Sequence, residues 1–306
     1  MSKYYFCIDV GGTEIKGGVI DEDYKILAQD KINTNLARDE GLDKAILTII
    51  DILEKNSGLK VNNSAGLGIA LPGIVDGEKG IIKYITSLDV KEYNIVEKLG
   101  EKIKAPIRLL NDAEAALLSE YRLGAGKGLD NFALITLGTG VGLGVMINGK
   151  SLRATSPYGC EFGHNYICGT TDVNLDKFVS TRALINRTKI AMTENKESEM
   201  WKSYTLEKVS GKTVFEYKDT DVTAKKVFDE YIKNLGIAVV NLCNVFLPET
   251  IIVGGGISRQ GEKLTKPLED FVNGHIFARN IDAKVKIKTA KFLNDAGILG
   301  ARCIFD

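Results

Sequence analysis

The sequence lacks the features that mark several classes of protein. No apolar run reaches the roughly 18 residues that a membrane span needs, and no signal-peptide core precedes the first expected strand. We therefore expect a cytoplasmic protein with no membrane partner. The five cysteines are an odd number with wide spacing, which argues against a disulfide framework. Lysine plus arginine and aspartate plus glutamate number 40 each, so the zero net charge gives no reason to expect nucleic acid as a partner.

The chain has the composition of an ordinary globular protein. With 306 residues, of which 44% are hydrophobic, it is long for a single core, and we expect two domains. No low-complexity linker separates them, and the boundary is expected within residues 112–131. We assign residues 1–115 to the first domain and 116–306 to the second, although the last helix could pack back on the first domain.

Two stretches predict glycine turns between paired strands. In residues 132–149, two short apolar segments flank Gly138, Thr139 and Gly140, and Asn148 begins a further hairpin turn. Such a turn can bring bare backbone N–H groups and one hydroxyl up to an anion.

The same pattern occurs near the N-terminus. There, strands expected at residues 5–10 and 15–20 flank Gly11, Gly12 and Thr13. Glycine is also what ordinary hairpin turns require. The presence of two matching copies favours anion binding over two ordinary turns.

The periodicity of apolar residues predicts a mixed α/β class for both halves. The expected strands are residues 4–10, 15–21, 26–34, 65–71, 107–110, 132–137, 141–147, 250–253 and 285–289. The expected helices are residues 42–53, 94–103, 113–123, 224–242, a segment from about 260, and 297–304. Residues 150–222 read as an insertion that is polar in its later part. Two such domains facing each other across a cleft would suit a nucleotide.

Two look-alike motifs are set aside. The glycines of the central turn lack the third glycine of a dinucleotide-binding fingerprint, and they lie in a hairpin instead of a strand-to-helix turn. Residues 210–213 resemble the end of a P-loop, but Leu206 stands where its first glycine should be.

Gly254, Gly255 and Gly256 lie between a strand and a helix, where they either let a nucleoside approach or simply make a tight connection.

Two aspartates and a lysine have alternative interpretations. Asp112 starts a helix, where it is either an N-cap or a general base. Asp9 comes just before the first glycine turn, where it either starts the turn or lies near a metal ion. Lys16 either helps to neutralise phosphate or is a solvated charge on a strand.

The ordered motifs resemble those of the ROK family of bacterial sugar kinases and repressors. They are Asp9-Val10-Gly11-Gly12-Thr13 with Lys16, Asn111-Asp112, Gly138-Thr139-Gly140, Glu161-Phe162-Gly163-His164, Gly254-Gly255-Gly256 and Ala296-Gly297-Ile298-Leu299-Gly300-Ala301. The resemblance covers essentially the whole chain. It implies two actin-like, ribonuclease H-like domains with a cleft for ATP and sugar, and it suggests a homodimer.

The resemblance also implies roles for individual residues. Asp112 would be the general base, and the two glycine turns would bind the phosphates of ATP. Asp9 would lie near Mg²⁺ through water, and Gly254, Gly255 and Gly256 would approach the nucleoside. The sugar would be bound by Asn111, Asp112, Glu161, His164, Asp176 and Gly73. Asp176 stands where the family has a glutamate, so its carboxylate is one methylene shorter; a lone histidine such as His164 could instead be structural.

One departure from the family bears on the substrate. Many members carry a cluster of three cysteines after this histidine that binds zinc, whereas here only Cys168 follows, so we expect no structural zinc. The β-glucoside kinases resemble zinc-less relatives, which favours phosphorylation of the 6-hydroxyl of a β-glucoside such as cellobiose, or of glucose. The alternatives are a kinase for N-acetylmannosamine or N-acetylglucosamine and a non-catalytic, sugar-responsive regulator.

Overall fold

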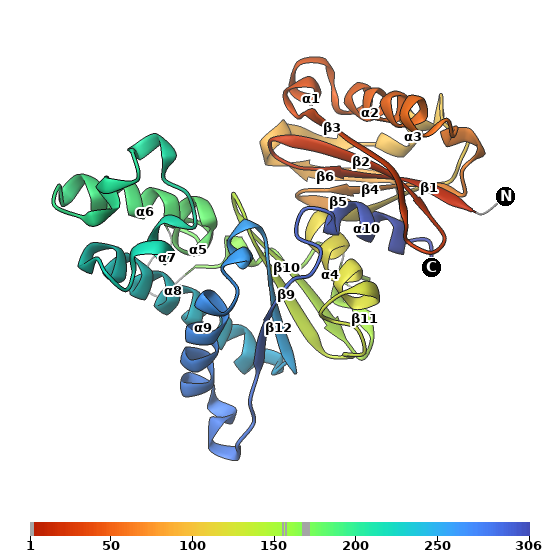
Figure 1. The fold of residues 1–306 in the computed structure, drawn as a ribbon. Coiled ribbons are helices and arrows are strands. Elements are labelled where there is room, and N and C mark those ends of the chain that lie inside the picture. Colours follow the sequence, from red (N-terminus) through yellow and green to blue (C-terminus); the bar gives the residue numbers. More distant parts are fainter. Residues whose placement is uncertain (1–2, 155, 157, 167–171) are drawn as a thin grey trace. The chain divides into compact units, whose positions relative to one another are not determined.

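The computed structural model describes residues 3–154, 156, 158–166 and 172–306, and its contacts divide the chain into two units (Figure 1). The first unit comprises residues 1–127, 150–159 and 294–306, and the second comprises 128–149 and 160–293. This division differs from the boundary assigned at residue 115. A cut there would separate the first turn of a helix from the rest of it, and that helix packs on the last helix of the chain.

The first unit is built on a sheet with the order β3-β2-β1-β4-β8. Its strands are β1 (Tyr4–Val10), β2 (Glu14–Asp21), β3 (Ile26–Asn33), β4 (Gly66–Leu71) and β8 (Ile107–Asn111). The first three are antiparallel, and β4 and β8 run parallel to β1. A second, antiparallel sheet contains β5 (Ile74–Asp76), β6 (Ile81–Ile85) and β7 (Val90–Tyr93). This sheet was not predicted, because its strands are short and only partly buried.

The helices of the first unit cover the larger sheet. They are α1 (Asn35–Glu40), α2 (Leu42–Ser57), α3 (Ile95–Gly100), α4 (Asp112–Leu123) and α10 (Ala296–Cys303). In α2 the apolar residues recur every three or four positions and are buried, as the periodicity predicts. The helix reaches the sheet at Gly17, where a Cβ atom would lie only 2.7 Å from Cδ1 of Leu53.

The second unit repeats this strand order. Its sheet contains β9 (Phe132–Leu137), β10 (Val141–Ile147), β12 (Thr250–Gly254) and β13 (Lys286–Thr289) in the order β10-β9-β12-β13. The hairpin of β9 and β10 is antiparallel, and β12 and β13 are parallel to β9. This matches β2-β1-β4-β8 of the first unit. The short β11 (Lys150–Ser151) follows β10.

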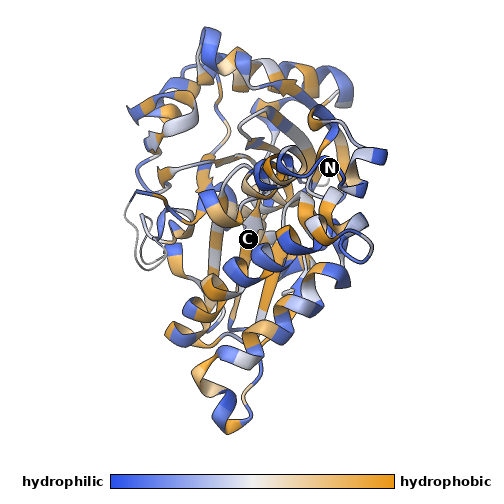
Figure 2. Cartoon of the chain, turned by 90° about the vertical axis from the view of Figure 1, so that its left-hand side faces the viewer, coloured by the Kyte–Doolittle hydropathy of each residue, from blue (hydrophilic) through white to orange (hydrophobic). Residues whose placement is uncertain are grey.

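The helices of the second unit correct one prediction. They are α5 (Asp176–Val179), α6 (Thr181–Glu194), α7 (Thr213–Tyr217), α8 (Val222–Phe246) and α9 (Glu262–His275). The insertion expected at residues 150–222 thus contains helices that its polar composition did not predict. Figure 2 shows hydrophobic residues along the strands, with hydrophilic and hydrophobic residues alternating on the helices. Among the described residues, no helix is both long and apolar enough to cross a membrane.

The last helix, α10, lies in the first unit beside α4, β1 and β4 (Figure 1). It approaches α4 so closely that a Cβ atom at Gly300 would lie 1.9 Å from the carbonyl oxygen of Ala115. At Gly68 of β4, a Cβ atom would lie 2.1 Å from the carbonyl oxygen of Ala301. Glycine at these two positions therefore lets the end of the chain pack into the first unit.

Replacing Gly300 with alanine should destabilise the protein, because the added methyl group meets backbone that cannot move without separating α10 from α4. Overpacking of this kind typically costs about 1–3 kcal/mol. Gly274→Ala in α9 is the matched control, since its Cβ atom meets nothing within 4 Å; there, alanine should be neutral or stabilise by up to about 1 kcal/mol. Urea unfolding measures both, and equal effects of the two substitutions would contradict the close packing of α10.

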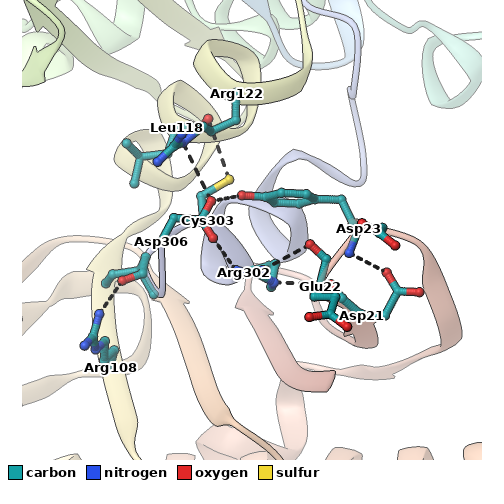
Figure 3. A network of polar contacts seen from close by, with 11 residues as sticks. Asp21, Glu22, Asp23, Arg108, Leu118, Arg122, Arg302, Cys303 and Asp306 are labelled. Carbon is teal, nitrogen blue, oxygen red and sulfur yellow. Dashed lines mark hydrogen bonds and ion pairs between the residues drawn. The ribbon is translucent and has the colours of Figure 1, made fainter. Parts of the chain in front are cut away.

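A polar network fixes the end of α10 (Figure 3). Arg302 is buried, with 3% of the residue exposed. Its guanidinium donates to Oδ1 of Asp306 at 2.7 Å and lies over the rings of Tyr5 and Tyr24. It also donates to the carbonyl oxygens of Asp21 and Glu22, each at 3.3 Å. This one side chain therefore links the end of the chain to β1 and to the turn after β2.

Candidate active site

The first glycine turn joins β1 to β2. The N–H of Gly11 donates to the carbonyl oxygen of Glu14 at 2.9 Å, and a Cβ atom at Gly11 would lie 2.9 Å from that oxygen. Two side chains bind the turn: the hydroxyl of Thr34 donates to the carbonyl of Gly11, and Nη2 of Arg38 to that of Gly12, both at 2.8 Å. Gly12 and Thr13 are exposed and therefore accessible to a ligand.

The second glycine turn joins β9 to β10. The N–H of Gly138 donates to the carbonyl oxygen of Gly140 at 3.0 Å and closes the turn. The start of α6 holds it: the hydroxyl of Thr181 donates to the carbonyl of Leu137 at 2.9 Å, and the N–H of Arg182 donates to that of Gly138 at 3.3 Å. Both turns thus have the strand–turn–strand form that the sequence predicts.

Asp9 is partly buried, next to the first turn and against the start of α10. A Cβ atom at Gly297 would lie 2.2 Å from Cγ of Asp9, so only glycine leaves room for the carboxylate. Burial raises the pKa of Asp9 to about 7, the negative charge of Asp112 adds to the rise, and Lys16 opposes it. The carboxylate of Asp9 is of the kind that suits Mg²⁺, which proteins typically bind through one or two carboxylates together with substrate phosphates.

Asp9→Asn should raise the free energy of unfolding at pH 8, measured by urea unfolding without divalent cations, by about 1–3 kcal/mol. The pKa of Asp9 is about 7 in the folded protein and about 3.9 in the unfolded chain. Its carboxyl group therefore lowers the free energy of unfolding as the pH rises from about 3.9 to about 7. The gain should therefore shrink toward pH 5. Asp219→Asn, at a carboxylate that is 78% exposed, should change little at either pH. A gain of the same size at both pH values would contradict the raised pKa.

Lys16 is turned toward the start of α10. Its Nζ forms an ion pair with Asp295 and donates to the carbonyl oxygen of Asn294 at 2.9 Å. The alternative that it is a solvated lone charge is therefore wrong. Its role in neutralising phosphate stays a prediction.

Asn111 and Asp112 lie where β8 passes into α4. Oδ1 of Asn111 accepts from the N–H groups of Ala113 and Glu114, so Asn111 is the N-cap. The N-cap position thus belongs to Asn111, and Asp112 is the exposed first residue of the helix, whose Oδ1 also accepts from the N–H of Ala113 at 2.8 Å. Nδ2 of Asn111 donates to the carbonyl oxygen of Gly73 at 3.0 Å, which brings together two residues expected at the sugar site.

A cavity of about 560 Å³ lies beside Asn111 in the first unit. The polar residues that line it include Asp76, Arg108, Asn111, Glu114, Arg153 and Tyr158. Asp76 accepts from the hydroxyl of Tyr158 at 2.8 Å, and burial raises the pKa of Glu114, while Ser151 and Arg153 oppose that rise. Acidic and basic groups in one wall can bind the many hydroxyl groups of a neutral polar ligand.

Glu161 and His164 lie on a loop of the second unit that contains the 3₁₀ helix η4 (Phe162–His164). Glu161 is partly buried and His164 is exposed. Within 3.5 Å of Nδ1 of His164 lies Nδ2 of Asn174, two residues before Asp176. Cys168, on which the zinc prediction rests, lies outside the described residues. In the part of the chain that the structure describes, no three His, Cys, Asp or Glu side chains are grouped for a metal ion.

Gly254, Gly255 and Gly256 connect β12 to the 3₁₀ helix η7 (Gly256–Gln260). Gly255 has φ +85°, and its Cβ atom would lie 2.2 Å from the carbonyl oxygen of Leu137. This glycine is therefore needed where β12 passes the end of β9. The turn expected to approach the nucleoside and the second glycine turn are therefore adjacent.

Several residues that shape these turns are not marked by any local sequence pattern. Thr34, Arg38 and Thr181 bind carbonyls in or next to the turns from 23, 26 and 44 positions away in the chain. Gly297 is different, because it belongs to a motif that was noticed but was given no contact. Its contact with Asp9 follows only from the packing of α10.

Comparison with known proteins places the chain among sugar kinases. The profile of the ROK family matches residues 5–306. A glucokinase of Halalkalibacterium halodurans is 33% identical over 97% of this chain and 93% of its own length. A beta-glucoside kinase of Listeria monocytogenes is 26% identical over 96% of this chain and 94% of its own length. The crystal structure of a ROK family glucokinase from Streptomyces griseus, in complex with glucose and AMPPNP, superimposes with a TM-score of 0.84 at 28% identity and covers 97% of both chains.

Proposed function

Because the chain belongs to the ROK family, and its α/β units are those of the actin-like fold, we propose that it is an ATP-dependent kinase that phosphorylates the 6-hydroxyl of glucose or of a β-glucoside ending in glucose. The observation that carries this proposal is Asp112, an exposed carboxylate at the start of α4 in the same unit as the first glycine turn. The relatives named glucokinase and beta-glucoside kinase support both acceptors.

We assign the role of general base to the carboxylate of Asp112. It accepts the proton of the 6-hydroxyl as that oxygen forms a bond to the γ-phosphorus, and the bond from phosphorus to the β-phosphate oxygen breaks to leave ADP. The N–H groups of the two glycine turns bind the phosphates, as the resemblance implies.

Asp9 is the residue that would hold Mg²⁺, through water. When bound, the ion would offset charge on the phosphates. The close approach of Gly297 keeps the carboxylate of Asp9 in one place. The glycines at 254–256 remain the proposed approach to the nucleoside.

Asn111, Glu161 and His164 are proposed to orient the sugar, with Gly73. Asn111 uses one hydrogen of its amide for Gly73, and the other can serve a sugar hydroxyl. This arrangement would fix Asn111 before the sugar binds, which lowers the entropy that binding costs.

The β-glucoside is favoured as a second acceptor by the cavity beside Asn111. The cavity has room beyond a single ring, and its wall of acidic and basic groups suits the hydroxyls of a second sugar. The absence of the zinc-binding cysteines from the sequence also favours a β-glucoside. An N-acetylhexosamine remains the alternative acceptor.

The experiment is a coupled ADP-release assay with Mg-ATP against glucose, cellobiose, N-acetylmannosamine and N-acetylglucosamine. Release with glucose or cellobiose well above that with the acetylated sugars would support the proposal, and the ratio of kcat/KM for glucose and cellobiose would choose between the two. A preference for an acetylated sugar would overturn the acceptor. No release with any of them would favour the non-catalytic regulator. Light scattering in solution would test the expected homodimer.

A further inference from the structure

The chain segment at residues 174–182, which contains α5 and the start of α6, contacts both functional loops of the second unit. Toward the second glycine turn, it binds the carbonyls of Leu137 and Gly138 through Thr181 and Arg182. Toward the loop of Glu161 and His164, the N–H of Leu175 donates to the carbonyl of Asn165 at 2.7 Å. One short segment therefore touches the proposed phosphate turn and the proposed sugar loop.

Asp176 is the residue of this segment that contacts both loops with one carboxylate. Its Oδ1 accepts from the N–H of Val141, the first residue after the turn, at 2.7 Å. A Cβ atom at Gly140 would lie 3.1 Å from Oδ2, and one at Gly163 would lie 2.1 Å from Oδ1. The carboxylate thus lies between two glycine backbones, one from each loop, with little free space on either side.

The geometry restricts what Asp176 can do. A hydrogen bond from a backbone N–H to an ionised carboxylate is short and strong, and here it engages Oδ1. The side chain is one methylene shorter than the glutamate of the resembling family, so it extends less far beyond the turn. A larger residue at Gly163 would meet both the carboxylate and the carbonyl oxygen of Val141, at 2.7 Å.

We infer that Asp176 is a positioning residue that fixes the second glycine turn and the loop of Glu161 and His164 against each other. This inference rests on the proposed function for its consequence, because the two loops are the ones proposed to bind phosphate and sugar. The nucleotide then depends on Asp176 even when no sugar is present. A residue that only binds sugar would not affect the free nucleotide complex.

The test compares Asp176→Ala and Asp176→Asn with Ser180→Ala. Alanine removes the acceptor for the N–H of Val141, whereas the amide oxygen of asparagine can still accept it. Ser180 caps α6, its hydroxyl accepting from the N–H of Ala183, and it is 1% exposed. Its substitution therefore destabilises the same region without removing a contact to either loop.

The first readout is amide hydrogen exchange of the full-length protein without ligands. Asp176→Ala should speed exchange at least threefold in the peptides that cover residues 137–144 and 161–166, while Ser180→Ala should leave both within the error. Faster exchange in neither peptide, or in only one of them, would overturn the inference. This readout does not require the protein to be a kinase.

The second readout is the affinity for Mg-AMPPNP without sugar, by titration calorimetry, and then the KM for each substrate. Asp176→Ala should weaken AMPPNP about tenfold and raise both KM values, while Asp176→Asn stays within about threefold of the parent. An unchanged AMPPNP affinity with a raised sugar KM alone would make Asp176 a sugar ligand and overturn the inference. If the parent protein neither binds AMPPNP nor releases ADP, the proposed function fails, and the exchange result decides the inference by itself.

Discussion

Replacing Asp112 with asparagine should lower kcat by about 10²–10⁴-fold, the range that a general base contributes. Asparagine has nearly the same size and can still accept hydrogen bonds, but it cannot take the proton of the 6-hydroxyl. Sugar and nucleotide affinities should stay within a few fold, because the cap of α4 and the contact to Gly73 belong to Asn111. The ADP-release assay measures kcat, and calorimetry measures the affinities.

The matched control is Glu262→Gln, because Glu262 is also an acidic first residue of a helix, in α9. Both substitutions lose the same interaction with the helix dipole, typically about 0.3–1 kcal/mol. Only the substitution at Asp112 should slow the reaction. If Asp112→Asn keeps the parental kcat, the base is another residue and the mechanism proposed here is wrong.

Replacing Arg302 with methionine should lower the free energy of unfolding by about 1–3 kcal/mol, the usual cost of losing the hydrogen bonds of a buried polar group. Methionine keeps much of the apolar volume, but it leaves the carboxylate of Asp306 without its charge partner on α10 (Figure 3). The contacts of the guanidinium with the rings of Tyr5 and Tyr24 are lost as well. Urea unfolding of the two proteins measures the difference.

Arg187→Met provides the comparison on the surface. Arg187 also pairs with a carboxylate, that of Glu230, but the two side chains are 54% and 43% exposed. Exposed pairs contribute about 0–1 kcal/mol, so this variant should unfold nearly as the parent does. Similar losses for both variants would mean that the network around Arg302 adds nothing beyond a surface ion pair.

Much of the fold could be predicted from local patterns. The structure contains the expected strands β1, β2, β9 and β10 and the expected helices α2, α4 and α8. They could be predicted because the spacing of apolar residues indicates the face that each element buries. The sheet of β5, β6 and β7 was missed, since strands of three to five residues leave too short a pattern. The helices of the insertion were missed because polar composition conceals a narrow buried face.

The candidate site divides in the same way. The glycine turns, Asn111, Asp112 and the loop of Glu161 and His164 were identified from residue type and order. The sequence did not identify which of Asn111 and Asp112 caps α4. Both residue types cap helices, and only the path of the chain decides between them.

By itself, the sequence determined the repeated strand–glycine turn–strand plan, the family, and the residue types available for phosphoryl transfer. These depend on short-range spacing and turn chemistry, which are written in neighbouring residues. Only the tertiary structure decided that Thr34 and Arg38 bind the first turn, that Asp176 contacts both loops of the second unit, and that the pKa of Asp9 is raised. Those properties arise from burial and from contacts between residues far apart in the chain, and no local pattern encodes them.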